Sequence, residues 1–307
     1  MANFQRVLEQ DPNRDDVRQR LAEVALGVGL LDVAAEQFQY LQERKPGEAS
    51  IAYRLGLTFE ARNQHAAAAK WYRTASELEP TDLDAYIRLA NVLRVKLGKQ
   101  AEADGCLDDM VRANPQSVRA YLARAVANKE ADRLQAADSD VKEAMRLAPD
   151  DADALLLAAD LGPRLGRPVD DARKHLLHAL AKHGDDPRCY EALAALEIQQ
   201  NNREAALSRL REGLRRIPDN ANLLWNEANL LIGLGRLDEA RPALARLQSA
   251  SLPPGRQEFL HAALQVQSGY WREGALAFET IRPLLTTEPA LAVQADLLLG
   301  ECFRMIG

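Results

Sequence analysis

Prolines recur along the first half of this sequence at a nearly constant spacing. Intervals of 34, 34, 35 and 34 residues separate Pro12, Pro46, Pro80, Pro115 and Pro149. The next interval ends at Gly184, and Pro218 follows 34 residues later. A fixed period of this length indicates a chain built from stacked copies of one small unit. The period predicts units that start near residues 15, 49, 83, 118, 152, 187, 221 and 255.

Three positions of the repeat carry the same kind of residue in every unit, and these three columns of equivalent residues support the register. The first column holds a small residue: Ala22, Gly56, Ala90, Ala125, Ala159, Ala194, Ala228 and Ala262. The second column is also small: Ala34, Ala68, Ala103, Ala137, Ala172, Ala206, Ala240 and Gly274. The third is large and apolar, four residues further on: Phe38, Tyr72, Leu107, Val141, Leu176, Leu210, Leu244 and Phe278. Small residues let two helix axes approach closely, and large ones fill the space beside them.

Each unit therefore reads as a helical hairpin. A turn residue follows the first helix of every unit: Gly29, Asn63, Gly98, Asp132, Gly166, Asn201, Gly235 and Gly269. A proline ends most second helices, and N-cap residues such as Asp82, Ser117, Asp151 and Asn220 begin the next unit. Such a hairpin cannot bury its own faces, so we expect an all-α solenoid and not two globular domains.

The stretch LGLTFEARNQHAAAAKWYRTASELEP (Leu55–Pro80) resembles the tetratricopeptide repeat family, and GRLDEA (Gly235–Ala240) is a second close match. The resemblance covers essentially the whole chain. It implies a right-handed superhelical solenoid of stacked antiparallel helix hairpins, with eight full repeats and a half-repeat at each end. Single insertions near 94–98 and 166–171 are expected in the turns inside hairpins. Arg124 and Glu227 stand where a bulky apolar residue is usual, and we expect them to weaken packing between repeats.

Both ends of the chain look like half of a hairpin. Residues 3–12 match a second helix, with Phe4 and Val7 at packing positions, and residues 290–307 match a first helix. The last helix still offers apolar side chains: Leu297, Leu298, Cys302, Phe303 and Ile306. Because solenoid ends normally carry a polar outer face, these ends suggest a fragment of a longer bacterial repeat protein. Natural single-helix caps are the alternative.

Composition narrows the functional classes. The net charge of -6 predicts no general attraction to nucleic acid or to an anionic membrane. The polar amino terminus has no signal-peptide pattern, and no run is long and apolar enough to cross a bilayer, so a cytoplasmic protein is expected. Cys106, Cys189 and Cys302 lie far apart and suit small buried apolar roles better than disulfides or a zinc site.

No motif predicts catalysis. His175 and His178 share a helix face, but no nearby carboxylate or cysteine completes a metal site, and exposed histidines are the simpler interpretation. Most paired acids, such as Asp150 and Asp151, fall at helix starts, where they complement the helix dipole. We therefore expect no enzymatic activity, no cofactor and no metal.

The resemblance implies a ligand-binding concave face lined by the first helices. The residues predicted to line it are Tyr53, Leu57, Ile87, Asn91, Leu122, Val126, Leu156, Trp225, Asn229 and Phe259. Further positions on the same helices are Gln19, Glu23, Asp160, Glu191 and Ala263. Family members that grip the acidic carboxyl terminus of heat-shock chaperones use Lys, Asn and Arg here, and this chain lacks that set. Packing between hairpins is the alternative role for the apolar members.

Two functional classes stay open. The first is a non-catalytic scaffold that binds a peptide or protein along the concave face. The second is the targeting or regulatory arm of a larger enzyme, such as a glycosyltransferase, kinase or protease. End-to-end self-association through the apolar ends is a third and weaker possibility.

Overall fold

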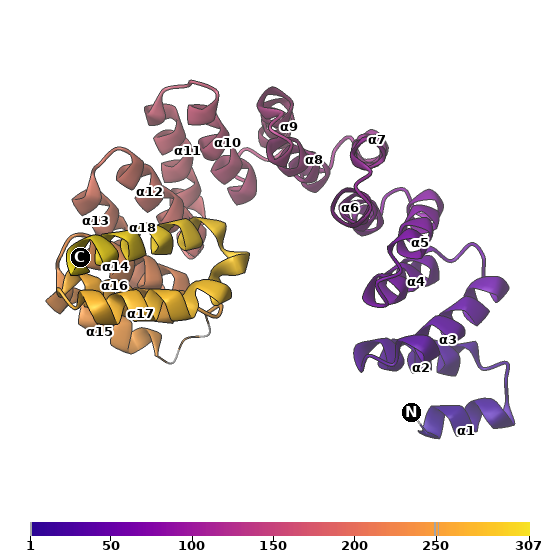
Figure 1. Cartoon of the computed structure of the whole chain (residues 1–307). Coiled ribbons are helices and arrows are strands. Elements are labelled where there is room, and N and C mark those ends of the chain that lie inside the picture. Colours follow the sequence, from indigo (N-terminus) through magenta and orange to yellow (C-terminus); the bar gives the residue numbers. More distant parts are fainter. Residues whose placement is uncertain (1, 249, 251) are drawn as a thin grey trace. The chain divides into compact units, whose positions relative to one another are not determined.

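The computed structural model describes residues 2–248, 250 and 252–307, and these residues form eighteen α-helices. Eight antiparallel hairpins account for sixteen of them (Figure 1). The first helices of the hairpins are α2 (Asp15–Gly27), α4 (Ala49–Ala61), α6 (Leu83–Asn91), α8 (Val118–Glu130), α10 (Ala152–Arg164), α12 (Pro187–Gln199), α14 (Ala221–Gly233) and α16 (Arg256–Gln267). The second helices are α3 (Leu31–Arg44), α5 (His65–Leu78), α7 (Gln100–Ala113), α9 (Leu134–Leu147), α11 (Val169–Lys182), α13 (Arg203–Arg216), α15 (Leu237–Leu247) and α17 (Trp271–Ile281). The predicted all-α fold of stacked hairpins is confirmed.

One helix lies outside the hairpins at each end. Helix α1 (Ala2–Gln10) packs against α2, with Phe4 and Val7 half-buried. Helix α18 (Pro289–Ile306) packs against α17 and contacts α16. On α18, Leu297 and Phe303 are exposed, whereas Cys302 is fully buried and so does not belong to the exposed apolar set expected there. None of the described helices is long and apolar enough to cross a membrane.

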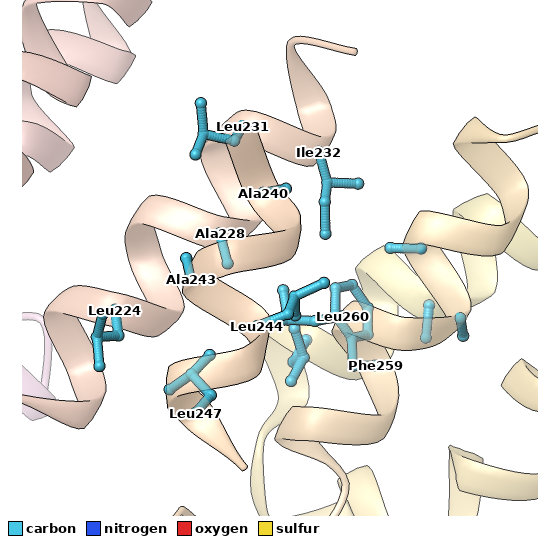
Figure 2. Close-up of a cluster of buried hydrophobic side chains, with 14 of the residues drawn as sticks. Leu224, Ala228, Leu231, Ile232, Ala240, Ala243, Leu244, Leu247, Phe259 and Leu260 are labelled. Atoms are coloured by element: carbon cyan, nitrogen blue, oxygen red, sulfur yellow. The ribbon is translucent and has the colours of Figure 1, made fainter. Parts of the chain in front are cut away.

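The chain divides into two compact units, Met1–Pro149 and Asp150–Gly307, here called unit 1 and unit 2. Within each unit, the second helix of one hairpin packs against the first helix of the next, as α5 does against α6 and α13 against α14. The three predicted columns are buried in every hairpin. Figure 2 shows one such core in unit 2, where Ala228, Ala240, Leu244 and Phe259 from three successive helices meet.

All eight predicted turn residues adopt a left-handed backbone, with φ between 56° at Asp132 and 84° at Gly269. Asn and Asp tolerate this region better than other residues with a Cβ, which explains why they replace glycine at three hairpins. The predicted N-caps are also present, since Asp82, Ser117, Asp151 and Asn220 each accept a hydrogen bond from a backbone N–H of the helix they precede.

The two inserted residues are absorbed in different ways. In the third hairpin the extra residue forms a π-helical turn, η1 (Val92–Lys96), at the end of the first helix, so the expectation of an insertion in the loop is wrong there. In the fifth hairpin the connection from α10 to α11 is one residue longer and includes Pro168 at the start of α11. The connection between α17 and α18 forms a 3-10 helix, η2 (Arg282–Thr287).

Candidate functional site

The predicted ligand-facing residues occupy the fifth and ninth positions of the repeat units. In unit 1 these are Tyr53 and Leu57 on α4, Ile87 and Asn91 on α6, and Leu122 and Val126 on α8. Asn91 is exposed and Val126 is 41% exposed, while the other four are half-buried. We call these six side chains the first-helix face of unit 1.

Tyr53 is tied to the neighbouring helices. Its ring centroid lies 5.6 Å from that of Tyr72 on α5. The Tyr72 hydroxyl donates a 2.5 Å hydrogen bond to Glu60 Oε2, and burial together with Glu60 raises the pKa of Tyr72. Arg88 of α6 lies 3.7 Å from the same Glu60 carboxylate. Tyr53, Leu57 and Ile87 all pack on the core of unit 1, so each presents only part of its surface to solvent.

In unit 2, two cavities open on the first helices. One of 250 Å³ is lined by Leu156 and Asp160 of α10 together with Ala195 of α12. The second, of 290 Å³, lies between α12, α13, α14 and α18 and is lined by Glu191, Ala195 and Asn229. The cavities adjoin, because Ala195 lines both. Four predicted positions, at Leu156, Asp160, Glu191 and Asn229, therefore line hollows in the surface.

The two predicted aromatics of unit 2 have structural roles. Phe259 is fully buried among Leu244, Leu260 and Phe278, so the prediction that it lines an accessible face is wrong (Figure 2). Its ring is covered from two helices, because it lies 6.3 Å from the ring of Trp225 on α14 and 5.5 Å from that of Phe278 on α17. Trp225 is half-buried, and its indole N–H donates a 3.0 Å hydrogen bond to the backbone carbonyl of Arg256, which connects α14 to α16.

Three polar residues of the second cavity, Arg203, Asn226 and Gln294, are absent from the sequence prediction. Asn226 lies on α14, one position after Trp225, and Gln294 lies on α18. The only sequence signal for Asn226 is a polar residue inside the apolar run LLWNEANLL. No sequence pattern marks Gln294, because its place in the cavity depends on how α18 packs.

The charged residues expected to weaken the stack are paired instead. Arg124 on α8 bonds Asp140 of its own hairpin at 2.6 Å and Asp108 of the preceding hairpin at 2.8 Å. Glu227, at the equivalent position of its repeat, accepts a 2.9 Å bond from Arg211, which is the residue equivalent to Asp108. The same contact between hairpins thus occurs twice with its charges reversed, so each charge that was expected to weaken the packing has an ion-pair partner on the neighbouring hairpin.

His178, which shares a helix face with His175, is held by Asp150. His178 Nε2 lies 2.7 Å from Asp150 Oδ1, and Lys182 Nζ lies 2.9 Å from the other carboxylate oxygen. Hydrogen bonds from Lys182 and His178 lower the pKa of Asp150, whereas burial lowers the pKa of His175. Within the described residues, no three His, Cys, Asp or Glu side chains are grouped as metal ligands.

All three cysteines are buried and free of disulfides. Burial raises the pKa of the Cys106 thiol to about 12 and that of Cys189 to about 11. Since the thiolate is the reactive form, these side chains act as small apolar groups.

Paired helices stacked in this way define a helical-repeat protein. Tetratricopeptide repeat models match residues 20–82 and 197–251, which fall in different units. Both units therefore contain tetratricopeptide repeats. Domains of this kind generally serve as protein-binding scaffolds and are typically non-catalytic. No curated protein sequence matches the chain.

Solved structures with the same fold have low sequence identity. A tetratricopeptide repeat protein from Parabacteroides merdae is 16% identical, with a TM-score of 0.61 over 83% of this chain and 98% of that one. Yeast Tom70 is 17% identical, with a TM-score of 0.69 over 95% of this chain and 64% of Tom70. Pseudomonas aeruginosa PilF is 19% identical, with a TM-score of 0.51 over 70% of this chain and 96% of PilF. At these identities the likeness concerns the fold alone.

Proposed function

We propose that the chain is a non-catalytic scaffold that binds a peptide or protein segment along its first helices. The observation that carries the proposal is the first-helix face of unit 1, where three successive first helices present equivalent positions to solvent. Four of the six side chains are apolar and half-buried, and Tyr53 is held by Tyr72, so the surface is fixed before a ligand arrives. Pre-ordered apolar and aromatic groups lose little conformational entropy on binding.

Asn91 supplies the polar contact that such a surface needs. Its amide is exposed, lies on the middle helix of the three and has both a donor and an acceptor. An extended peptide exposes one backbone N–H and one C=O per residue, and an asparagine can bond both groups. The first-helix face therefore suits an extended, apolar segment whose backbone is recognised at Asn91.

A peptide-display selection on the full chain tests this function. Peptides that bind the wild type are measured against Asn91→Ala and Val126→Lys, two exposed changes that leave the core intact. Each change should weaken binding by about tenfold or more. The matched control is Leu78→Lys, an equally exposed apolar residue on the second helix α5, and it should have no effect. Equal losses at all three positions, or unchanged affinity at Asn91 and Val126, would contradict the proposal.

A further inference from the structure

The 290 Å³ cavity of unit 2 gathers four acidic or amide side chains from three helices, and Arg203 of α13 also lines it. Glu191 comes from α12, Asn226 and Asn229 from α14, and Gln294 from α18. Ile198 and Leu210 supply part of the apolar wall. The volume is at the lower end of the range of ligand pockets, which suits one long side chain better than a whole cofactor.

These polar groups have no hydrogen-bond partners within the described part of the chain. Glu191 Oε1 is buried and accepts no hydrogen bond. No hydrogen bond is formed by the amides of Asn226, Asn229 or Gln294 either. A buried carboxylate oxygen without a donor costs free energy, and most such groups in folded proteins are satisfied.

The polar cavity of unit 1 shows the contrast. That 390 Å³ hollow contains Asp104, Asp108 and Asp140, and each of these carboxylates is bonded by Arg124 or Arg133. The carboxylates of this cavity are all paired with arginines of the same unit, so none of them needs a ligand. In the unit 2 cavity, the Glu191 carboxylate is a hydrogen-bond acceptor without a donor.

Nearby charges do not neutralise Glu191. Burial raises its pKa, and the largest opposing influence comes from Arg256, whose guanidinium is already bonded to Glu288 at 2.7 Å. Arg203 also lines the cavity, but it is exposed and makes no ion pair with Glu191. What the cavity lacks is a cationic donor at Glu191.

We propose that this cavity binds a lysine or arginine side chain of a partner peptide, with Glu191 as the counter-ion and Asn226, Asn229 and Gln294 bonding the adjacent peptide groups. The inference rests on the proposed peptide-binding function and adds a charge requirement to it. An ammonium or guanidinium group supplies the missing donor, and its methylene stem covers the apolar wall.

The test uses single-residue probes, so it does not depend on an identified partner. N-acetyl-arginine N-methylamide and its lysine counterpart are titrated into isotope-labelled protein, and the side-chain amide signals of Asn226, Asn229 and Gln294 are followed by NMR. N-acetyl-norleucine N-methylamide is the uncharged control. We expect saturable shifts with the cationic probes, and at least about tenfold weaker binding of the norleucine probe.

Three variants assign the binding effect to Glu191. Glu191→Gln should weaken the cationic probes by about tenfold or more, whereas Glu258→Gln, which changes an exposed glutamate on α16, should leave binding unchanged. Because Glu191 has no partner, Glu191→Gln should not lower the melting temperature, and this checks that the fold is intact. Arg203→Gln should leave binding equal or tighter.

Three results would overturn the inference: no shift with either cation, equal binding by norleucine, or full binding to Glu191→Gln. If any of these occurs while displayed peptides still depend on Asn91 and Val126, the charge requirement fails and the scaffold function stands. If displayed peptides also fail to depend on those two residues, the scaffold proposal fails with it.

Discussion

Individual side chains decide how closely the helices of a hairpin can approach. Gly56 lies against Tyr72, and a Cβ built at Gly56 would come within 2.5 Å of the tyrosine ring. Gly213 and Gly274 are similar, with Tyr190 and Val266 as the obstructing neighbours. Other repeats carry alanine at the position of Gly56, and two of them combine that alanine with phenylalanine in the third column, as Ala22 does with Phe38. The close approach at Gly56 is therefore a local property of the hairpin that contains Tyr72.

Replacing Gly56 with alanine should destabilise the protein. The added methyl group has no space beside the buried Tyr72, and overpacking of this kind costs about 1 to 3 kcal/mol, which outweighs the gain in helix propensity. Gly105→Ala is the matched control, because Gly105 is an exposed glycine in helix α7 with nothing near its missing Cβ. It should stabilise by about 0.5 to 1 kcal/mol. Urea unfolding of both variants checks the two signs, and stabilisation by Gly56→Ala would contradict the packing argument.

Removing the Arg124 side chain should be costly. Asp140 is 4% exposed, and Arg124→Ala leaves its carboxylate without a cation, so we expect a loss of about 2 to 4 kcal/mol. Arg146→Ala removes an exposed ion pair to Glu143 within one helix and should cost less than about 1 kcal/mol. Chemical denaturation compares the two changes, and equal costs would show that the ion pairs of Arg124 add no more stability than an exposed pair does.

At the scale of the helix, the turns and caps follow from the sequence more closely than the insertions do. The left-handed turn and the capping side chain are local chemistry, so the eight turn residues and the four caps could be read without a structure. The π-turn at 92–96 could not, because an extra residue is absorbed in a helix or in a loop according to the packing of both helices.

Deleting Val95 should restore a regular hairpin. Val95 is exposed within the π-turn, and its removal leaves a first helix of the usual length followed by the same Gly98 turn. We expect cooperative unfolding with stability within about 1 kcal/mol of the wild type. Deleting Ile198, an exposed residue near the end of the regular helix α12, shifts the following residues out of register and should prevent cooperative unfolding. Thermal unfolding by circular dichroism separates the outcomes, and similar behaviour of both deletions would contradict this account.

Acid should weaken the ion pairs that join successive hairpins. Hydrogen bonds from Arg236 and Arg211 lower the pKa of Glu239 to about 2 from an ordinary value of 4.5. The ionised carboxylate therefore stabilises the fold above pH 4.5, and this contribution is lost as the pH falls through about 2. Glu239→Gln should lower the melting temperature most above pH 5, and the difference from wild type should vanish near pH 2. A difference that grows on acidification would reverse the sign and contradict the assignment.

The candidate site was less predictable than the fold. Equivalent positions on first helices could be found from the repeat, and Asn91 and Val126 are indeed exposed. Phe259 has the same repeat position as Tyr53, yet it is buried because its neighbours differ. Glu191 was recognised by position alone, and its missing partner is a property of the packed unit. Periodicity tells which face a residue occupies but not how much of that face the next hairpin covers.

At the scale of the whole chain, stability is distributed over hairpins that contact only their neighbours. The two units each have their own hydrophobic clusters. In such stacks the free energy of unfolding is close to a sum over repeats and their interfaces. Changes such as Gly56→Ala should therefore act mainly within unit 1, while binding can involve several repeats at once.

Hydrogen–deuterium exchange on the full chain, with and without a display-selected peptide, tests the central claim most directly. If the chain is a scaffold that binds through its first helices, bound peptide should slow exchange in α4, α6 and α8 and leave the second helices α5, α7 and α9 unchanged. The variant Val126→Lys should abolish that protection at the same peptide concentration. Protection confined to the second helices, or protection that persists in Val126→Lys, would contradict the claim.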